Sequence, residues 1–295
     1  MFTQPAWCPN PDCVHHDSGA KGFYKKNGTY RTKHDRQRVP RYLCRGCGRS
    51  FNSRSFLSTA GQHKPEVNKP LMGLLCSGVT MRRAARLLGL ARRTVEQRVR
   101  WMAGQARKAH AEFLAASPVL TSYVQFDEME TYEGSRLRQL SIALAVRPKT
   151  GQILAAEVGT MNCHGVMAKV SRAIYGHRRD TRMAACRRAL ANVRMVAKKS
   201  ITLATDGKDS YRPPVREVLP NAVHSVHNNV RVPKMEKPLA PPRWDPLFRL
   251  NQMIAKLRAD LARLGRQTWS ASKTASGLAD HLAIYIAFNN GYKIV

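Results

Sequence analysis

Residues 123–133 read YVQFDEMETYE and hold four of the 19 acidic side chains in a chain that carries 50 lysines and arginines. Their first half, residues 123–126, is aromatic and β-branched, which is typical of a buried strand. Asp127 then lies at or near the end of that strand. An inward-facing carboxylate at a strand end is typical of the first metal ligand of a phosphotransfer site. A strand that leaves the core through a solvated acidic turn gives the same pattern.

The segments after this stretch predict an α/β domain over residues 119–295. Residues 138–147 and 152–158 read as two further strands around a Pro-Lys-Thr-Gly turn, so a three-stranded meander is expected. Residues 165–199 are rich in Ala and Arg and predict helix, and residues 201–205 return to strand just before Asp206. If the first and last of these strands are parallel neighbours, Asp127 and Asp206 lie side by side.

The C-terminal part of this domain is expected to be helical. Residues 231–246 are rich in proline and predict a loop. Residues 247–264 predict a helix whose core-facing stripe consists of Leu250, Ile254, Leu257, Leu261 and Leu264. Residues 278–288 are apolar enough for a buried helix.

The charge balance indicates a polyanionic partner. The formal net charge is +31, and the excess of Lys and Arg is shared by both halves of the 295-residue chain. Nucleic acid is the natural partner for such a chain. An anionic membrane surface is the competing interpretation, but no amphipathic segment has the bulky apolar face that membrane binding needs. No apolar run of spanning length and no signal-peptide pattern appear in the sequence, so we expect a cytoplasmic, nucleoid-associated bacterial protein.

Four cysteines near the N-terminus predict a structural zinc site. Cys8 and Cys13 form one close pair, and Cys44 and Cys47 form a second after an intervening loop. Two such pairs can place four thiolates around one Zn2+, which predicts a zinc ribbon over residues 1–58. Disulfides or free thiols are the alternative, although cytosolic chains rarely keep disulfides. Residues 22–42 interleave aromatic and basic side chains, as expected either for a DNA-contacting ribbon or for a solvated one.

Residues 62–116 predict a helical DNA-binding domain. Thr80 is placed to cap a helix that runs to Leu88, and Gly89 turns the chain into another helix that begins near residue 91. In that helix Val95, Val99 and Met102 share the inward face. This pattern is typical of a helix-turn-helix, whose recognition helix reads base edges in the major groove. The candidate DNA-binding side chains are Arg92, Arg93, Gln97 and Arg100. A purely structural three-helix unit is the alternative.

Three motifs together carry a resemblance to a known family. FDEM at residues 126–129, ATDGKDSY at 204–211 and LRADLARLGRQTWSASK at 257–273 resemble the signatures of bacterial insertion-sequence transposases of the insertion-sequence-one family. The resemblance covers nearly the whole chain, since that family also has a zinc ribbon followed by a helix-turn-helix. It implies an RNase H-like core that uses three acidic residues and two Mg2+ or Mn2+ ions to cleave and join DNA strands.

Residue by residue, the resemblance assigns Asp127 and Asp206 as the first two acids. The family glutamate falls on Asn251, which offers one neutral oxygen where Glu offers two charged ones. Asn251 is then a working metal ligand, or an acid from the preceding loop replaces it, with Glu236 and Asp245 as candidates. The third interpretation is that the site has lost its activity.

Two function classes follow from these features. The first is a transposase that binds the terminal repeats of its element and target DNA as a homodimer or higher oligomer. Arg258 or Lys256 would then hold flanking phosphates. The second is a catalytically inactive, sequence-specific DNA-binding protein that keeps the same scaffold. Both classes are consistent with the zinc ribbon, the helix-turn-helix and the positive charge. Only the carboxylate site distinguishes the transposase from the inactive DNA-binding protein.

Overall fold

The computed structural model describes residues 5–17, 20–32, 36–116, 120–227, 245–266 and 268–295. Two compact units are present, Met1–Val67 and Asn68–Val295. The chain is mixed α/β, as the sequence predicts.

The first unit is built on a small antiparallel sheet in the order β1-β2-β3. Its strands are β1 (Tyr24–Arg31), β2 (Arg38–Cys44) and β3 (Ser50–Asn52). Two 3-10 turns follow, η1 (Ser53–Phe56) and η2 (Pro65–Val67). The buried side chains of this unit are mainly Phe23, Phe51 and cysteines. Such a small apolar core favours an added metal cross-link as the source of stability.

Three helices open the second unit: α1 (Asn68–Leu75), α2 (Met81–Leu87) and α3 (Arg92–Ala115). The hydroxyl of Thr80 accepts a hydrogen bond from the backbone N–H of Arg83 at 3.2 Å, which confirms the predicted cap of α2. Val95, Val99 and Met102 are buried, as the apolar stripe predicts. The helix that carries this stripe is 24 residues long.

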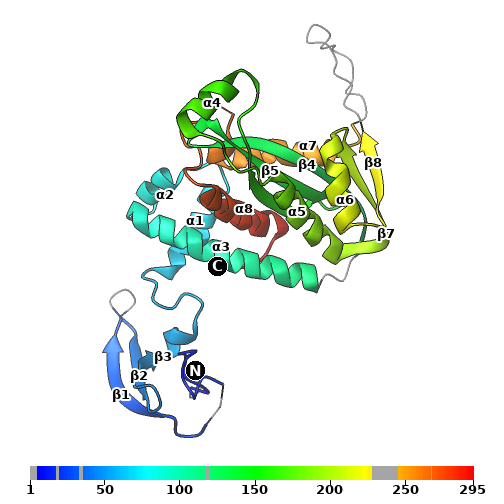
Figure 1. Ribbon diagram of the computed structural model, residues 1–295. Coiled ribbons are helices and arrows are strands. Elements are labelled where there is room, and N and C mark those ends of the chain that lie inside the picture. The colour runs from blue at the N-terminus through cyan, green and yellow to red at the C-terminus, as the bar shows by residue number, and fades with distance from the viewer. Residues whose placement is uncertain (1–4, 18–19, 33–35, 117–119, 228–244, 267) are drawn as a thin grey trace. The chain divides into compact units, whose positions relative to one another are not determined.

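A five-stranded sheet forms the centre of the second unit (Figure 1). Its order is β6-β5-β4-β7-β8, and its strands are β4 (Thr121–Glu133), β5 (Ser135–Arg147), β6 (Gln152–Thr160), β7 (Ala197–Asp206) and β8 (Val223–His227). β4, β5 and β6 pair antiparallel, so the predicted meander is confirmed. β4 pairs with β7 in parallel, and β7 pairs with β8 in parallel. The strands that carry the two aspartates are therefore parallel neighbours, which is the condition under which Asp127 and Asp206 lie side by side.

Helices cover both faces of this sheet. They are η3 (Gly165–Met167), α4 (Ala168–Tyr175), α5 (Arg182–Val196), η4 (Asp209–Tyr211), α6 (Arg212–Val218), α7 (Phe248–Asp260), η5 (Ala262–Leu264) and α8 (Ala275–Asn290). On one face Val124 and Phe126 pack with α5 and α6. On the other Met129 packs with α3, α7 and α8. Successive strand side chains point to opposite faces, so β4 contributes to both cores.

Three details differ from the sequence predictions. Asp127 lies in the middle of a 13-residue strand, because β4 continues along β5 to Glu133. The predicted helix over residues 165–199 is divided at Gly176, which ends α4 with a φ of +70° that favours glycine. Residues 197–199 belong to β7. The predicted domains 62–116 and 119–295 lie in one compact unit, because α3 shares its buried side chains with α8 and the sheet.

Candidate functional site

Asp127 and Asp206 occupy equivalent positions on neighbouring parallel strands. The last registered pair between β4 and β7 is Gln125 with Ala204, and each aspartate follows two residues later on its own strand. Side chains two residues apart share a face, so both carboxylates lie on the face to which Gln125 points. Adjacent strands are about 4.8 Å apart. The two acids are thus close neighbours at the edge where the parallel pairing ends.

Asp127 is partly buried, and its pKa reflects that position. Burial raises the pKa of this carboxyl, the charge of Asp206 raises it further, and the result is about 6 instead of 3.8. Two hydrogen bonds oppose this rise, because Oδ1 of Asp127 accepts from the Tyr211 hydroxyl at 2.9 Å and from the Glu128 N–H at 2.6 Å. A positive charge beside this carboxyl, such as that of a bound divalent cation, would favour the ionised form of Asp127.

Two of the other acids of residues 123–133 have cationic partners, and the third lies near a histidine. Glu128 is bound by Lys208, and it also accepts from the Ser141 hydroxyl at 2.7 Å. Glu130 lies 3.7 Å from the ring of His164, and Glu133 forms salt bridges with Arg138 and Arg178. In the part of the chain that the structure describes, Asp127 is the one acid of the four without a salt bridge. The acidic stretch therefore contributes a single carboxylate to the candidate site.

Tyr211 and Lys208 connect the two aspartate strands. Besides donating to Asp127, the Tyr211 hydroxyl accepts from the Glu128 N–H at 3.1 Å, and its ring packs edge-on against Phe126. The Lys208 N–H donates to Oδ1 of Asp206 at 3.2 Å, and its ammonium lies 5.4 Å from the centre of the Tyr211 ring. Both residues follow β7 directly, so the segment after Asp206 fixes the carboxylate of Asp127.

Gln125 attaches the start of α7 to the same strand. Its Nε2 donates to the carbonyl of Pro246 at 2.6 Å, and its Oε1 accepts from the backbone N–H of Leu250 at 2.9 Å. Asn251 is the next residue of the helix, and its side chain is exposed. The amide Nδ2 of Asn251 donates to Oδ2 of Asp245 at 2.8 Å. Two of the candidate third ligands are thus hydrogen-bonded to each other at the start of α7.

The third metal ligand remains a prediction. Among the described residues, the only group of three or more Cys, His, Asp or Glu side chains close enough to hold one ion is the four-cysteine cluster. Asp127, Asp206 and Asp245 do not form such a group. Glu236 lies outside the described residues. A single amide oxygen is a weaker ligand than a carboxylate, so the site is short of one negative charge if Asn251 fills the third position.

The four cysteines of the first unit converge as predicted. Sulfur atoms of Cys8, Cys13, Cys44 and Cys47 all lie within 4.8 Å of one another, and all four thiols are free of disulfides. The backbone N–H of Arg49 lowers the pKa of Cys47 to about 6, whereas burial raises the pKa of Cys8 to about 12. Four thiolates in one cluster could hold a metal ion, and the donor set is that of structural zinc.

The predicted recognition residues gather at the start of α3. Arg92, Arg93, Gln97 and Arg100 line a surface pocket of about 400 Å³ together with Glu96. Arg93, Gln97 and Arg100 are exposed. Arg92 donates to Glu96 at 2.9 Å, so its charge is partly neutralised. The helix therefore presents two guanidiniums and one amide to solvent along one face.

Gln125 and Tyr211 are two site residues that were not predicted from the sequence. A glutamine in an otherwise apolar buried strand is the available signal for Gln125, because such a side chain needs partners for its amide. Tyr211 is part of the ATDGKDSY motif but reads as an ordinary core aromatic. Its contact with Asp127 depends on the pairing of segments 84 residues apart.

Comparisons with protein-family models and with curated proteins give no match for this chain. Among the described helices, none combines the length and the apolar character needed to cross a membrane. The geometry of the site is therefore the basis for any functional assignment.

Proposed function

We propose that this protein is a DNA transposase that cleaves and joins DNA strands with the help of divalent metal ions at Asp127 and Asp206. The observation that carries the proposal is the equivalent placement of these two aspartates at the end of the parallel pairing between β4 and β7. Three antiparallel strands followed by two parallel ones, in the order β6-β5-β4-β7-β8, agree with the expected RNase H-like core.

The electrostatics of the site support a cation-binding role. The ionised form of Asp127 is unfavourable because it is partly buried beside a second acid, and the raised pKa of Asp127 reflects this free-energy cost. Strong perturbation of an acid in this setting is typical of functional sites. Hard divalent cations prefer carboxylate oxygens, and the Asp127–Asp206 pair supplies such oxygens from two rigid strands.

Each residue has a definite part in the proposed reaction. When bound, Mg2+ or Mn2+ would supply an activated nucleophile and charge stabilisation for in-line attack on a phosphodiester. Asp127 and Asp206 hold the metal ions. Tyr211 orients Asp127 through its hydroxyl, and Gln125 fixes the start of α7, where Asn251 and Asp245 offer further oxygens.

The positive charge and the first unit fit a DNA substrate. The net charge of +31 favours binding to phosphate backbones, and the face of Arg93, Gln97 and Arg100 has the side chains that read base edges. We assign the four-cysteine cluster to structural Zn2+. The terminal repeats of an element and a target duplex are the proposed partners, bound by a homodimer or higher oligomer.

The proposal is tested by strand cleavage. The protein should nick supercoiled plasmid DNA and join strands on DNA that carries the element ends when Mg2+ or Mn2+ is present. Asp127→Asn and Asp206→Asn should abolish both reactions. Asp209→Asn is the matched control, because this nearby carboxylate is 87% exposed and pairs only with Arg212 among the described residues. Cleavage that survives Asp127→Asn would refute the proposal.

The second candidate function is a catalytically inactive DNA-binding protein. It is favoured by Asn251, a neutral side chain at the position of the family glutamate, which donates its amide to Asp245. In that case the wild-type protein binds the element ends but does not cleave them at any Mg2+ or Mn2+ concentration. Activity that appears only after Asn251→Glu would identify a transposase inactivated at this position.

A further inference from the structure

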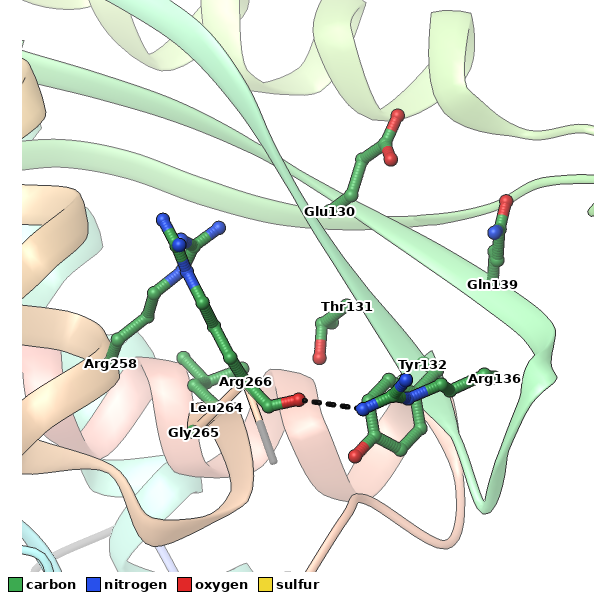
Figure 2. A pocket seen from close by; sticks show the side chains of 9 residues that line it. All are labelled: Glu130, Thr131, Tyr132, Arg136, Gln139, Arg258, Leu264, Gly265 and Arg266. Atoms are coloured by element: carbon green, nitrogen blue, oxygen red, sulfur yellow. Dashed lines mark hydrogen bonds between the residues drawn. The ribbon is translucent and has the colours of Figure 1, made fainter. Parts of the chain in front are cut away.

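Three arginines line a pocket on the second unit, away from the two aspartates. The pocket has a volume of about 240 Å³ and lies between β4, β5 and the segment that follows α7. Arg258 and Arg266 extend into it from the α7 side, and Arg136 approaches from β5 (Figure 2). Thr131 contributes a hydroxyl from β4. Figure 2 shows Glu130, the acid at the rim, with its carboxylate directed away from the arginines.

The segment that carries Arg266 is held in place by two hydrogen bonds. Arg136 donates to the carbonyl of Arg266 at 3.4 Å, and the Tyr132 hydroxyl donates to the carbonyl of Thr268 at 3.1 Å. Both donors come from the β4–β5 hairpin. Arg266 is therefore presented by a segment that is anchored to the hairpin, whereas Arg258 is presented by α7.

The charge in the pocket is not balanced by protein groups. Within the described ranges, Arg136, Arg258 and Arg266 form no salt bridge, and Glu130 is directed to His164. Burial and the charge of Arg266 lower the pKa of Arg258. Arg258 is half-buried and Arg266 is exposed. Their like charges repel, and an anion bound between them would remove that cost. The planar fork of Arg matches phosphate oxygens in particular.

The position of the pocket relates it to the candidate metal site. Thr131 follows Asp127 by four residues on the same face of β4, which corresponds to about 14 Å along a strand. Arg258 follows Asn251 by seven residues on α7, which is about 10 Å along the helix axis and two turns on nearly the same face. The pocket and the aspartates thus lie on the same side of the sheet, separated by the length of a few nucleotides.

We propose that the Arg258–Arg266 pocket binds a backbone phosphate of the nucleic-acid strand, a few nucleotides from the phosphodiester held at Asp127 and Asp206. This inference rests on the proposed function for the path of the strand. Arg258 and Arg266 contact the phosphate oxygens, and the Thr131 hydroxyl donates to a third oxygen. Arg136 and Tyr132 are positioning residues that hold the segment of Arg266. Lys256, the other sequence candidate for a flanking phosphate, is exposed outside this pocket.

The first test measures how DNA binding depends on salt. Each neutralised phosphate contributes about 0.9 to the slope of log K against log[salt] on duplex DNA. Arg258→Gln and Arg266→Gln should each lower the slope by about 0.5 to 0.9, and the double variant should lose no more than about 1, because both side chains hold the same phosphate. Arg194→Gln is the control, since Arg194 is an exposed arginine of α5. Equal losses for Arg194→Gln and Arg258→Gln would overturn the proposal.

A second test uses the wild-type chain and so does not depend on the folding of a variant. An arginine-selective dicarbonyl reagent is applied with and without a DNA duplex, and modification is read at each residue by peptide mass spectrometry. We expect DNA to reduce modification of Arg258 and Arg266 at least threefold more than that of Arg194. Equal reactivity of Arg258 with and without DNA overturns the inference.

The two proposals fail separately in this design. Protected arginines in a protein that never cleaves DNA would refute the transposase function and retain the phosphate pocket. Active cleavage with unprotected Arg258 and Arg266 would retain the transposase function and overturn the pocket. Neither test requires added Mg2+, so both can be run without cleavage of the DNA.

Discussion

Replacing Asp127 by Asn should make the protein more stable in the absence of Mg2+ and should abolish cleavage when Mg2+ is present. The folded-state pKa of Asp127 is about 6, above the value of 3.8 expected without the fold. The folded chain therefore binds this proton more tightly than the unfolded chain, and the carboxylate costs stability at any pH above 6. A shift of this size corresponds to about 2–3 kcal/mol at pH 7.5. Asparagine keeps an oxygen that can accept from Tyr211 and from the Glu128 N–H without carrying the charge.

The sign of the effect makes the experiment specific. The cost of the Asp127 carboxylate is fully present above pH 6 and shrinks as the pH falls from 6 to about 4. It disappears only below 3.8, where the carboxyl is protonated in both states. The gain from Asp127→Asn should follow the same course. For a unit of this size a gain of about 2–3 kcal/mol raises Tm by about 4–10 °C.

The assay is thermal unfolding of the wild-type protein and the variant at pH 7.5 and pH 4.5. Buffers contain neither added Mg2+ nor chelator, so that metal in the four-cysteine cluster is retained. Asp209→Asn, which removes an exposed carboxylate, should leave Tm within about 1 °C. Addition of Mg2+ should raise Tm of the wild-type protein and have little effect on Asp127→Asn. A loss of stability at pH 7.5, or a gain of equal size at both pH values, would refute the reasoning.

Three further predictions concern the other candidate sites. Cys44→Ser should lower bound zinc from about one ion per chain to near zero and unfold the first unit, measured by metal analysis and limited proteolysis; a metal-free wild-type protein with an intact first unit would contradict this. Arg93→Ala and Arg100→Ala should each reduce the preference for specific over random DNA by about 1–3 kcal/mol in competition binding, and equal losses for both DNAs would exclude a recognition helix. Asn251→Ala should abolish cleavage with DNA binding unchanged, whereas Asn251→Glu should tighten Mg2+ binding; if neither variant changes activity, the third ligand lies elsewhere.

Local patterns were sufficient to predict most elements of the second unit. The apolar residues 123–126, the meander and the stripe through Leu250 and Leu257 are short-range signals that the structure confirms. The order of elements, with a helical crossover between β4 and β7, permitted a parallel pairing of these strands but did not require it, and the structure shows that pairing. The four-cysteine cluster could also be predicted from the sequence, because the two cysteines of each pair are close in sequence.

Long-range partners explain what the sequence did not reveal. The strand through Asp127 looked as if it ended there, because an acidic run is unfavourable in a core. Glu128 is nevertheless accommodated in β4 by Lys208, which lies 80 positions away. The contact of Tyr211 with Asp127 and the attachment of α7 through Gln125 likewise depend on chain segments that meet only in the fold. Arg258 was a candidate for phosphate binding, but its convergence with Arg266 required the structure.

The length of α3 has a consequence for the proposed function, because this helix joins the proposed recognition residues to the unit that holds Asp127 and Asp206. This helix carries the exposed arginines at its first turns and is packed along α8 further on, so its 24 residues form a rod of about 36 Å within one compact unit. If a flexible linker joined the recognition surface to the catalytic sheet, the distance between the recognised sequence and the cleavage site would vary. In the proposed transposase, α3 would be a rigid spacer of fixed length between the two, and it would determine how many base pairs separate the recognised sequence from the cleavage site.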